Sequence, residues 1–295
     1  MTTAFQSLGF VGLGVMGEGM CSNVVRKSPV PVYGFDLNPE PLQRLSELGL
    51  KPQASLEAVA ENAELVLLSL PGGPQVEQVC RQLLARPGKL KFVVDMSTAP
   101  ASLARSLAED FVKIGVQFVD APVARLRQAA RDGTLSIMVG ATPEVFETVK
   151  PVLGYMGTDV TRCGEVGAGQ VVKVLNNMVV FMNVQALAEA LAIGEAAGVD
   201  GKTLFDVLAL GSADSFMLRN AGMKSLVPHD FPLAAFPTDY AIKDISYALD
   251  LANEVGLDPT GAKATQALLA ATSEAGFKKE YYPVFLKTIE GTRGK

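Results

Sequence analysis

The sequence predicts an α/β protein in which a doubly wound parallel sheet is followed by an all-helical second domain. Up to about residue 163, short apolar runs rich in β-branched residues alternate with amphipathic stretches, separated by Gly, Pro or Asp. After Gly164, long Ala-rich stretches with a helical period replace these short runs. A length of 295 residues suits about two domains. We therefore expect a first domain over 1–163 and a helical second domain over 164–295.

Six runs in the first half are apolar at nearly every position, as strands buried on both faces of a parallel sheet should be. These predicted strands are Leu8–Gly12, Pro31–Phe35, Leu65–Leu70, Phe92–Asp95, Gln117–Asp120 and Ser136–Gly140. The second half contains helical stretches over Val171–Val199 and Ile242–Gly256, with no strand-like run between them. The first of these is apolar around its circumference as far as Phe181, which predicts a long interdomain helix buried on all sides.

The composition indicates a globular protein that handles a small molecule. With 48% hydrophobic residues the chain is too apolar for disorder, yet no apolar run approaches the roughly 18 residues that cross a bilayer. A net charge of −5 argues against a nucleic-acid partner. Met1–Ser7 carries no signal-peptide pattern, and three widely spaced cysteines suit reduced thiols, so we expect a cytoplasmic protein with no membrane partner. The single histidine excludes metal sites built on two imidazoles, and no metal is expected.

A glycine motif, Gly12-x-Gly14-x-x-Gly17, directly follows the first predicted strand and opens the next helical stretch. Gly12 supplies a tight turn, Gly14 lets the backbone approach a pyrophosphate, and Gly17 lets the helix pack closely on the strand. The helix N-terminus then favours the phosphates. We therefore predict a Rossmann-type domain with cofactor contacts from the whole motif: Gly12, Leu13, Gly14, Val15, Met16 and Gly17.

An acidic residue, Asp36, ends the second predicted strand, close to the distance at which a ribose-binding acid follows this motif. A carboxylate accepts hydrogen bonds from both ribose hydroxyls and repels a 2′-phosphate, so we favour NAD over NADP and place Asp36 and Leu37 in the cofactor site. Arg26 and Lys27, at the end of the intervening helix, leave room for a phosphate. The alternative is a glycine-rich turn and a loop aspartate in an ordinary α/β domain.

Two later strand ends belong to the same edge of the predicted sheet, where ligands of open α/β sheets bind. Leu70 and Pro71 follow the third run, and Ser97 and Thr98 follow the fourth. We expect all four to line the cofactor site. The alternatives are a simple turn at Pro71 and a helix cap at Ser97 or Thr98 ahead of Pro100.

Polar residues interrupt the apolar helix at Lys173, Asn176 and Asn177. Lys173 and Asn177 are four residues apart and share one helix face. Burying an ammonium group is costly unless it faces a wet cleft or a partner. We favour catalysis, because partial burial lowers the pKa of a lysine from roughly 10.4 and makes it a usable acid/base for a hydroxyl proton. The alternative is a snorkelling lysine whose neighbouring asparagines bond another helix.

Four motifs in order resemble those of the β-hydroxyacid dehydrogenases over nearly the whole chain. They are GFVGLGVMG near the start, DAPV at 120–123 with GTLSIMVG at 133–140, GAGQVVKVLNN at 167–177 and IKDISYAL at 242–249. The resemblance implies that Lys173 is catalytic, that Asn177 binds substrate and that Lys243 closes over cofactor or substrate. From the residues alone, Lys243 forms an exposed helix pair with Asp239.

The chain departs from this family after Val123. The family has Ser-Gly-Gly there, whose hydroxyl and amides hold a substrate carboxylate, whereas this chain has Ala124-Arg125-Leu126. Arg125 brings a permanently charged fork suited to carboxylate, sulfonate or phosphate, so we infer a shifted or larger anion bound by Val123, Ala124 and Arg125. Family members that reduce sulfolactaldehyde resemble this pattern in carrying arginine there.

Three further residues are open to two interpretations. Arg127 and Arg131 either add to the positive charge beside Arg125 or belong to a solvated helix face, at whose spacing they fall. Phe236, in the segment before the fourth motif, either lines the substrate pocket or belongs to the core.

Together these features predict an enzyme with its site in a cleft between the two domains. We expect reversible NAD-dependent hydride transfer between a 3-hydroxy acid, or a sulfonate or other anionic analogue, and its semialdehyde or ketone. The long Ala-rich helix offers a packing surface, so a homodimer or homotetramer is expected. Two alternatives are an imine reductase-like enzyme, which usually lacks the lysine, and a catalytically silent dehydrogenase-fold binding protein.

Overall fold

The computed structural model describes residues 4–233 and 235–292. Met1–Thr3, part of the N-terminal stretch considered above, lie outside the described residues. The chain divides into two compact units, residues 1–173 and residues 174–295. The division falls inside one long helix, ten residues later than the boundary at 163 that the sequence indicates.

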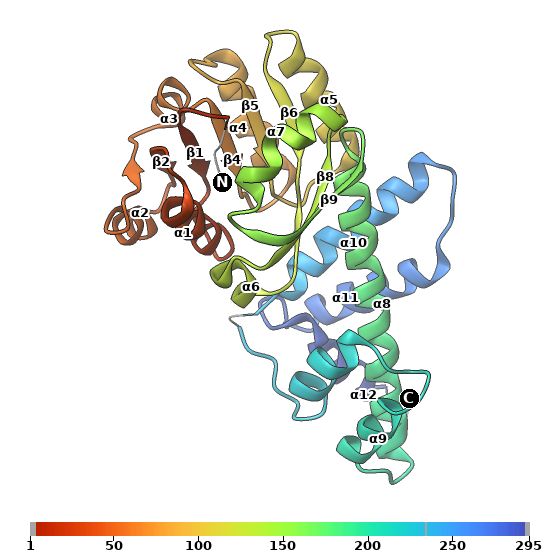
Figure 1. Cartoon of the computed structure of the whole chain (residues 1–295). Helices are drawn as coiled ribbons and strands as arrows, with labels where there is room; N and C mark the ends of the chain where they lie inside the picture. Colours follow the sequence, from red (N-terminus) through yellow and green to blue (C-terminus); the bar gives the residue numbers. More distant parts are fainter. Residues whose placement is uncertain (1–3, 234, 293–295) are drawn as a thin grey trace. The chain divides into compact units, whose positions relative to one another are not determined.

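A nine-stranded sheet forms the first unit and can be followed in Figure 1 from the red β1 to the green β9. Every predicted strand is present within a residue or two of its expected bounds. Three strands were not predicted, of which β3 and β7 have only two residues each. The strands are β1 Leu8–Val11, β2 Val32–Phe35, β3 Lys51–Pro52, β4 Leu65–Leu68, β5 Phe92–Asp95, β6 Gln117–Asp120, β7 Val123–Ala124, β8 Leu135–Gly140 and β9 Gly157–Gly164.

The strand order is β3-β2-β1-β4-β5-β6-β8-β7, and β9 pairs with the other side of β8. From β3 to β6 all neighbours are parallel, with Leu8 aligned on both Val32 and Leu65. The order reverses between β1 and β4, which is the switch point where such sheets bind ligands. One expectation needs correction: β8 runs antiparallel to β6 and β7 and is parallel only to β9. A short β6–β7–β8 return therefore interrupts the regular βαβ series.

Helices cover both faces of this sheet, and each face has its own apolar core. One face packs against α1 Gly17–Lys27, α2 Pro39–Ser46, α6 Arg127–Asp132 and α7 Pro143–Leu153. The other packs against α3 Leu56–Asn62, α4 Gly73–Ala85 and α5 Ala101–Val112. Asn38, Ser55 and Thr142 start α2, α3 and α7 by accepting a first-turn N–H. The predicted doubly wound fold is confirmed.

In the described residues of the second unit the regular elements are all helical, apart from a single bridge between Pro237 and Tyr281. Its elements are the larger part of α8 Ala168–Ala196, α9 Gly201–Leu208, a π-helix Leu218–Leu226, α10 Thr238–Glu254, α11 Thr260–Glu274, a 3₁₀ turn Tyr282–Val284 and α12 Phe285–Glu290. They enclose a separate core that includes Phe181, Phe205 and Phe285.

The prediction that α8 is buried on all sides was wrong. Val172, Leu175, Val179 and Ile193 are all exposed, Val179 by 59% and Ile193 by 69%. A helix that is apolar on every face is expected to avoid water, but this pattern does not show that residues of the same chain cover every face. By length and composition alone α8 is also apolar enough to span a membrane, although no single uninterrupted apolar run in it is that long.

Candidate active site

The loop after β1 has the geometry that a glycine motif provides for a dinucleotide. Gly12 adopts a positive φ of +89°, and a Cβ there would lie 2.2 Å from the carbonyl oxygen of Ser69. A Cβ at Gly17 would lie 2.0 Å from the carbonyl oxygen of Gly12. At Gly14, in contrast, a Cβ would meet nothing within 4 Å. Two glycines are therefore required by packing within the fold, and the third faces open space of the kind a pyrophosphate fills.

Asp36 ties this loop to the end of β2. Its Oδ2 accepts the N–H of Leu13 at 2.5 Å and its Oδ1 accepts the N–H of Asn38 at 2.7 Å. Two predicted cofactor residues expose apolar side chains nearby in sequence, Val15 by 63% and Leu37 by 93%. Met16, between Val15 and Gly17, is half-buried. A carboxylate with flanking exposed apolar groups fits the ribose and base of a nucleotide.

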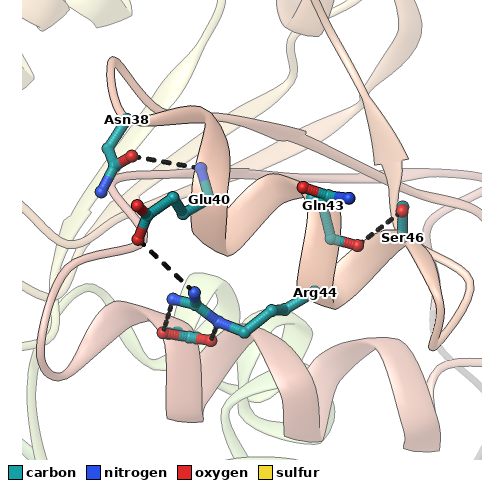
Figure 2. A network of polar contacts seen from close by, with 6 residues as sticks. Asn38, Glu40, Gln43, Arg44 and Ser46 are labelled. Carbon is teal, nitrogen blue, oxygen red and sulfur yellow. Dashed lines mark hydrogen bonds and ion pairs between the residues drawn. The ribbon is translucent and has the colours of Figure 1, made fainter.

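Basic side chains around this end of the unit already have partners. Figure 2 shows Arg44 in α2, whose Nη1 lies 3.7 Å from Glu40, and the same guanidinium forms two hydrogen bonds with Glu18 at 2.7 and 3.0 Å. The Arg44 guanidinium beside Glu18 holds the pKa of that carboxyl below its usual range. Arg44 is therefore engaged at the first turn of α1, where a 2′-phosphate would otherwise attract it. Lys27 donates to the carbonyl of Tyr155 at 2.6 Å and is the last residue of α1, about 15 Å along the helix from Gly17.

The predicted residues after β4 and β5 lie together. Ser97 is 4% exposed, and its hydroxyl accepts the N–H of Leu70 at 2.8 Å. The Ser97 N–H in turn donates to Asp95 at 2.9 Å. Helix α5 begins at Ala101 without a side-chain cap, so the helix-cap alternative for Ser97 was wrong. Pro71, which follows Leu70, is exposed, and Thr98, which follows Ser97, is half-buried.

Asp120, the last residue of β6, holds the first turn of α8. Its Oδ1 accepts the Gly167 N–H at 2.7 Å, and its Oδ2 accepts the Gln170 N–H at 2.8 Å. Burial raises the pKa of Asp120 to about 6, against the lowering effect of these donors. The half-buried Lys173 follows Gln170 by three residues on the same helix. The predicted catalytic lysine thus projects from a helix end that is fastened to the sheet.

Arg125 stands just after β7 with a left-handed backbone, at a φ of 85°. This is a conformation that glycine adopts freely and other residues rarely do. Its guanidinium donates to the Thr134 carbonyl, to Thr158 Oγ1 at 3.1 Å and to Asp159 Oδ2 at 2.6 Å. The backbone therefore has a conformation suited to glycine, while the Arg125 side chain reaches the start of β9. Val123 and Ala124 are half-buried in β7, paired with β8.

In the second unit the predicted residues Asn177 and Lys243 meet at one carboxylate. Asn177 is 7% exposed and donates to Asp244 Oδ2 at 2.6 Å. The Lys243 ammonium lies 3.0 Å from Asp244 Oδ1 and within 5.5 Å of the ring centroids of Tyr240 and Tyr247. Lys243 is therefore held by Asp244 and two aromatic rings. Asp239, the other member of the helix-pair alternative, accepts a hydrogen bond from Ser273 Oγ at 3.1 Å.

Phe236 belongs to an aromatic cluster in the second unit. Its ring centroid lies 6.1 Å from Phe181 and from Tyr240, and 6.2 Å from Tyr282. Phe181 and Tyr282 are buried in the core of this unit. The structure thus places Phe236 at the core, with Tyr240 linking it to Lys243.

Sequence reasoning missed four polar residues that organise these positions. Asp120 accepts from Gly167, Asp159 accepts from Arg125, Gln170 donates to the Ser97 carbonyl, and Asp244 accepts from Asn177. Asp120 and Gln170 stand inside quoted motifs, so a polar residue at a buried strand end or helix start was an available signal. Glu195, His229 and Glu290 also gather, with ligand atoms within 4.8 Å of one another. None of those three belongs to a predicted site.

The glycine loop, the acid after β2 and the seated lysine helix define the class of protein: a dinucleotide-dependent oxidoreductase. Residues 7–164 match the family described as the NAD binding domain of 6-phosphogluconate dehydrogenase. Residues 167–282 match the NAD-binding family of NADP-dependent 3-hydroxyisobutyrate dehydrogenase. The chain belongs to the β-hydroxyacid dehydrogenase family.

Individual relatives agree with this assignment. The 2-(hydroxymethyl)glutarate dehydrogenase of Eubacterium barkeri is 34% identical, over 97% of this chain and 96% of its own. The 2-hydroxy-3-oxopropionate reductase of Escherichia coli K12 is 31% identical, over 96% and 97%. A structure of Mycobacterium tuberculosis 3-hydroxyisobutyrate dehydrogenase with L-serine has 28% identity and a TM-score of 0.88, over 98% and 99%. These matches support an NAD(P)-dependent enzyme acting on CH–OH groups and do not favour the imine reductase or silent-protein alternatives.

Proposed function

We propose that this chain interconverts a 3-hydroxy acid carrying a second anionic group and the corresponding aldehyde, with NAD as the preferred cofactor. The observation that carries this proposal is Arg125, a charged side chain in a left-handed backbone conformation that glycine adopts more freely. A guanidinium pairs with a carboxylate, sulfonate or phosphate, so Arg125 suits a substrate that carries a further anionic group.

Lys173 moves the hydroxyl proton in the proposed reaction. Bound NAD+ supplies the chemistry of hydride acceptance, and the open space at Gly14, the Asp36 carboxylate and the exposed Val15 and Leu37 fit such a cofactor. When the hydroxyl proton leaves, the neutral lysine accepts it at Nζ. In the reverse direction the ammonium returns a proton to the aldehyde oxygen.

The preference for NAD is supported by the charges near Asp36. A 2′-phosphate would meet the carboxylate of Asp36, while Arg44 is engaged with Glu18. Repulsion between the Asp36 carboxylate and a 2′-phosphate lowers the affinity for NADP relative to NAD.

Asn177 and Lys243 are proposed to orient substrate and cofactor. Asn177 Nδ2 donates to Asp244 and Asn177 Oδ1 accepts from Asn176 Nδ2 at 3.1 Å, so both ends of the Asn177 amide are fixed. The same carboxylate and two tyrosine rings restrain Lys243. A preorganised amide and ammonium lose less entropy when they bind an anion.

We further propose a homodimer or homotetramer in the cytoplasm. The exposed Val172, Leu175, Val179 and Ile193 along α8 support self-association, because apolar side chains gathered on one element favour a partner. Free thiols at Cys21, Cys80 and Cys163 suit a reducing compartment. Light scattering of the purified chain tests the subunit count, and fractionation of cells that express it tests the location.

Two substrates with the same reacting end test the proposed reaction. 2-(Hydroxymethyl)glutarate and 3-hydroxyisobutyrate both carry a hydroxymethyl group next to a carboxylate, and only the first has a second carboxylate. We expect NAD+ reduction, followed at 340 nm, to be at least about 10-fold more efficient with the dicarboxylate. A sulfonate-bearing 3-hydroxy acid in the same assay shows which anion Arg125 prefers.

Lys173→Ala tests the role of the proposed catalytic lysine, and Lys202→Ala is its matched control. Lys202 is an exposed lysine that pairs with Asp206 in α9, so its loss should leave turnover unchanged. Lys173→Ala should lower kcat by about 10²-fold or more, the usual range for a general acid/base. Wild-type turnover in Lys173→Ala, or equal use of both substrates, would contradict the proposal.

A further inference from the structure

One connected set of hydrogen bonds in the first unit joins the helix that carries Lys173 to the loops after β4 and β5. Gln170 is fully buried, and its side-chain amide is used at both ends. Its Oε1 accepts the Ala99 N–H at 3.0 Å, and its Nε2 donates to the Ser97 carbonyl at 2.8 Å. The Ser97 hydroxyl continues the set by accepting the N–H of Leu70.

Asp120 fixes the same helix turn from a second direction. It reaches Gly167 and the backbone of Gln170 from the end of β6, and it is fully buried. Close packing restricts this contact further: a Cβ at Gly140 would lie 2.1 Å from Asp120 Oδ1, and one at Gly169 would lie 2.9 Å from Oδ2. The first turn of α8 is therefore held along its axis by Asp120 and against rotation by the Gln170 side chain.

We infer that Gln170 and Asp120 are positioning residues for the proton transfer, which set where Lys173 Nζ stands relative to the segment from Ser97 to Ala99. This inference rests on the proposed role of Lys173. Gln170 and Lys173 are three positions apart, so the two project from α8 about 60° apart and 4.5 Å along its axis. A small rotation of the first turn therefore moves the ammonium sideways, and misplacement by about 1 Å can cost about 100-fold in rate.

A purely structural role for these residues makes a different prediction. If the bonds only stabilise the fold, their loss lowers the unfolding temperature and leaves the turnover of each folded molecule unchanged. If they position Lys173, their loss lowers kcat only while Lys173 is present to be positioned. A double-mutant cycle between Gln170 and Lys173 separates the two roles.

The experiment uses the full-length chain with Gln170→Met, which keeps the length of the side chain and removes its donor and acceptor. We expect kcat to fall about 10- to 100-fold while the Kd for NAD+, measured by calorimetry, changes less than about 3-fold. In the Lys173→Ala background the same change should lower residual turnover less than about 3-fold. Asp120→Asn, which keeps one carbonyl acceptor, should show the same non-additivity in a parallel cycle.

Asn23→Leu is the matched control. Asn23 is another buried amide in the first unit, and it donates to the carbonyls of Ala130 and Arg131 at 2.9 Å. Its loss should lower the unfolding temperature with kcat per folded molecule within about 2-fold of wild type.

Additive losses in both cycles would overturn the positioning role. A Lys173→Ala protein with wild-type turnover would instead overturn the proposed function, so the two failures can be told apart. If Gln170→Met does not fold, the Asp120→Asn cycle decides the question by the same criterion.

Discussion

The Arg125 guanidinium lies 2.6 Å from Asp159 Oδ2, and both side chains are about half exposed, by 44% and 54%. Hydrogen bonds from Thr158 and Arg125 hold the pKa of Asp159 below its usual range. Asp159 therefore competes with any substrate anion for the guanidinium. Replacing Asp159 should reveal what Arg125 does in the reaction.

Asp159→Asn should lower KM several-fold for 2-(hydroxymethyl)glutarate and leave that for 3-hydroxyisobutyrate unchanged, because it frees the guanidinium for the second carboxylate. Arg125→Gly should lower kcat/KM for the dicarboxylate about 30-fold, the equivalent of about 2 kcal/mol for a charged hydrogen bond. Steady-state kinetics on both substrates measures this. Equal effects on the two acids would show that Arg125 takes no part in substrate recognition.

Arg125→Gly should also leave the free energy of unfolding within about 1 kcal/mol of wild type. Glycine relieves the left-handed strain, which costs about 1 kcal/mol, while an exposed ion pair contributes at most a similar amount. Urea unfolding followed by circular dichroism gives the value. A loss above about 2 kcal/mol would show that the contacts with Thr134 and Asp159 stabilise the fold far more than an exposed pair does.

The glycine loop offers a pair of substitutions with opposite outcomes. Gly14→Ala places its methyl group in open space, so the apo protein should unfold at the wild-type temperature while NAD+ binds at least about 10-fold more weakly. Gly17→Ala pushes a methyl group against the Gly12 carbonyl and should destabilise the apo protein by about 1–3 kcal/mol. Thermal unfolding and calorimetry distinguish these results. Normal NAD+ affinity in Gly14→Ala would place the pyrophosphate elsewhere.

Cofactor preference should shift on loss of one charge. Asp36→Asn keeps an acceptor for the Leu13 N–H and removes the repulsion of a 2′-phosphate, so the NAD+ to NADP+ ratio of kcat/KM should fall by about 10-fold or more. Arg44→Ala is the comparison, because Arg44 is occupied by Glu18 and Glu40 and its loss should leave the ratio unchanged. A ratio unaffected by Asp36→Asn would mean that this carboxylate serves only the loop.

Stability should depend on pH through Asp120. Burial raises its pKa in the folded state to about 6 from 3.8, so the folded state holds the proton more firmly between these values. The contribution of Asp120 to stability is thus fullest below about pH 4 and declines up to about pH 6, by at most about 3 kcal/mol. The free energy of unfolding of wild type minus that of Asp120→Asn, from urea titrations at pH 4 to 7, should fall over this range. A difference that rises with pH would show that the Gly167 and Gln170 donors outweigh burial.

Much of the fold was predictable because its signals are local. The strand, glycine turn and helix around Gly12 and Gly17 follow one another in the sequence, and continuous apolar runs identify β4 and β5. Strands of two residues such as Val123–Ala124 give no such signal. Their pairing depends on β8, which turns back on β6 through a contact between Asp120 and Gly140.

The candidate site was predictable residue by residue, but its connections were not. Lys173 and Asn177 stand out because polar groups are unexpected in an apolar helix. The partners that hold them, Asp120 for the helix start and Asp244 for Asn177, lie 50 or more residues away along the chain. Arg125 shows the same limit: its charge was evident, whereas its contact with Asp159 depends on where β9 begins.

The fastening of α8 at Asp120 also constrains the length of the chain. Each added residue in a helix turns everything beyond it by 100° and advances it by 1.5 Å. One extra or missing residue between Gln170 and Lys173 would leave the contacts of Asp120 intact and point the lysine in another direction. Within the 29-residue helix Ala168–Ala196, positions 171 and 172 should therefore accept changes of side chain far more readily than insertions or deletions.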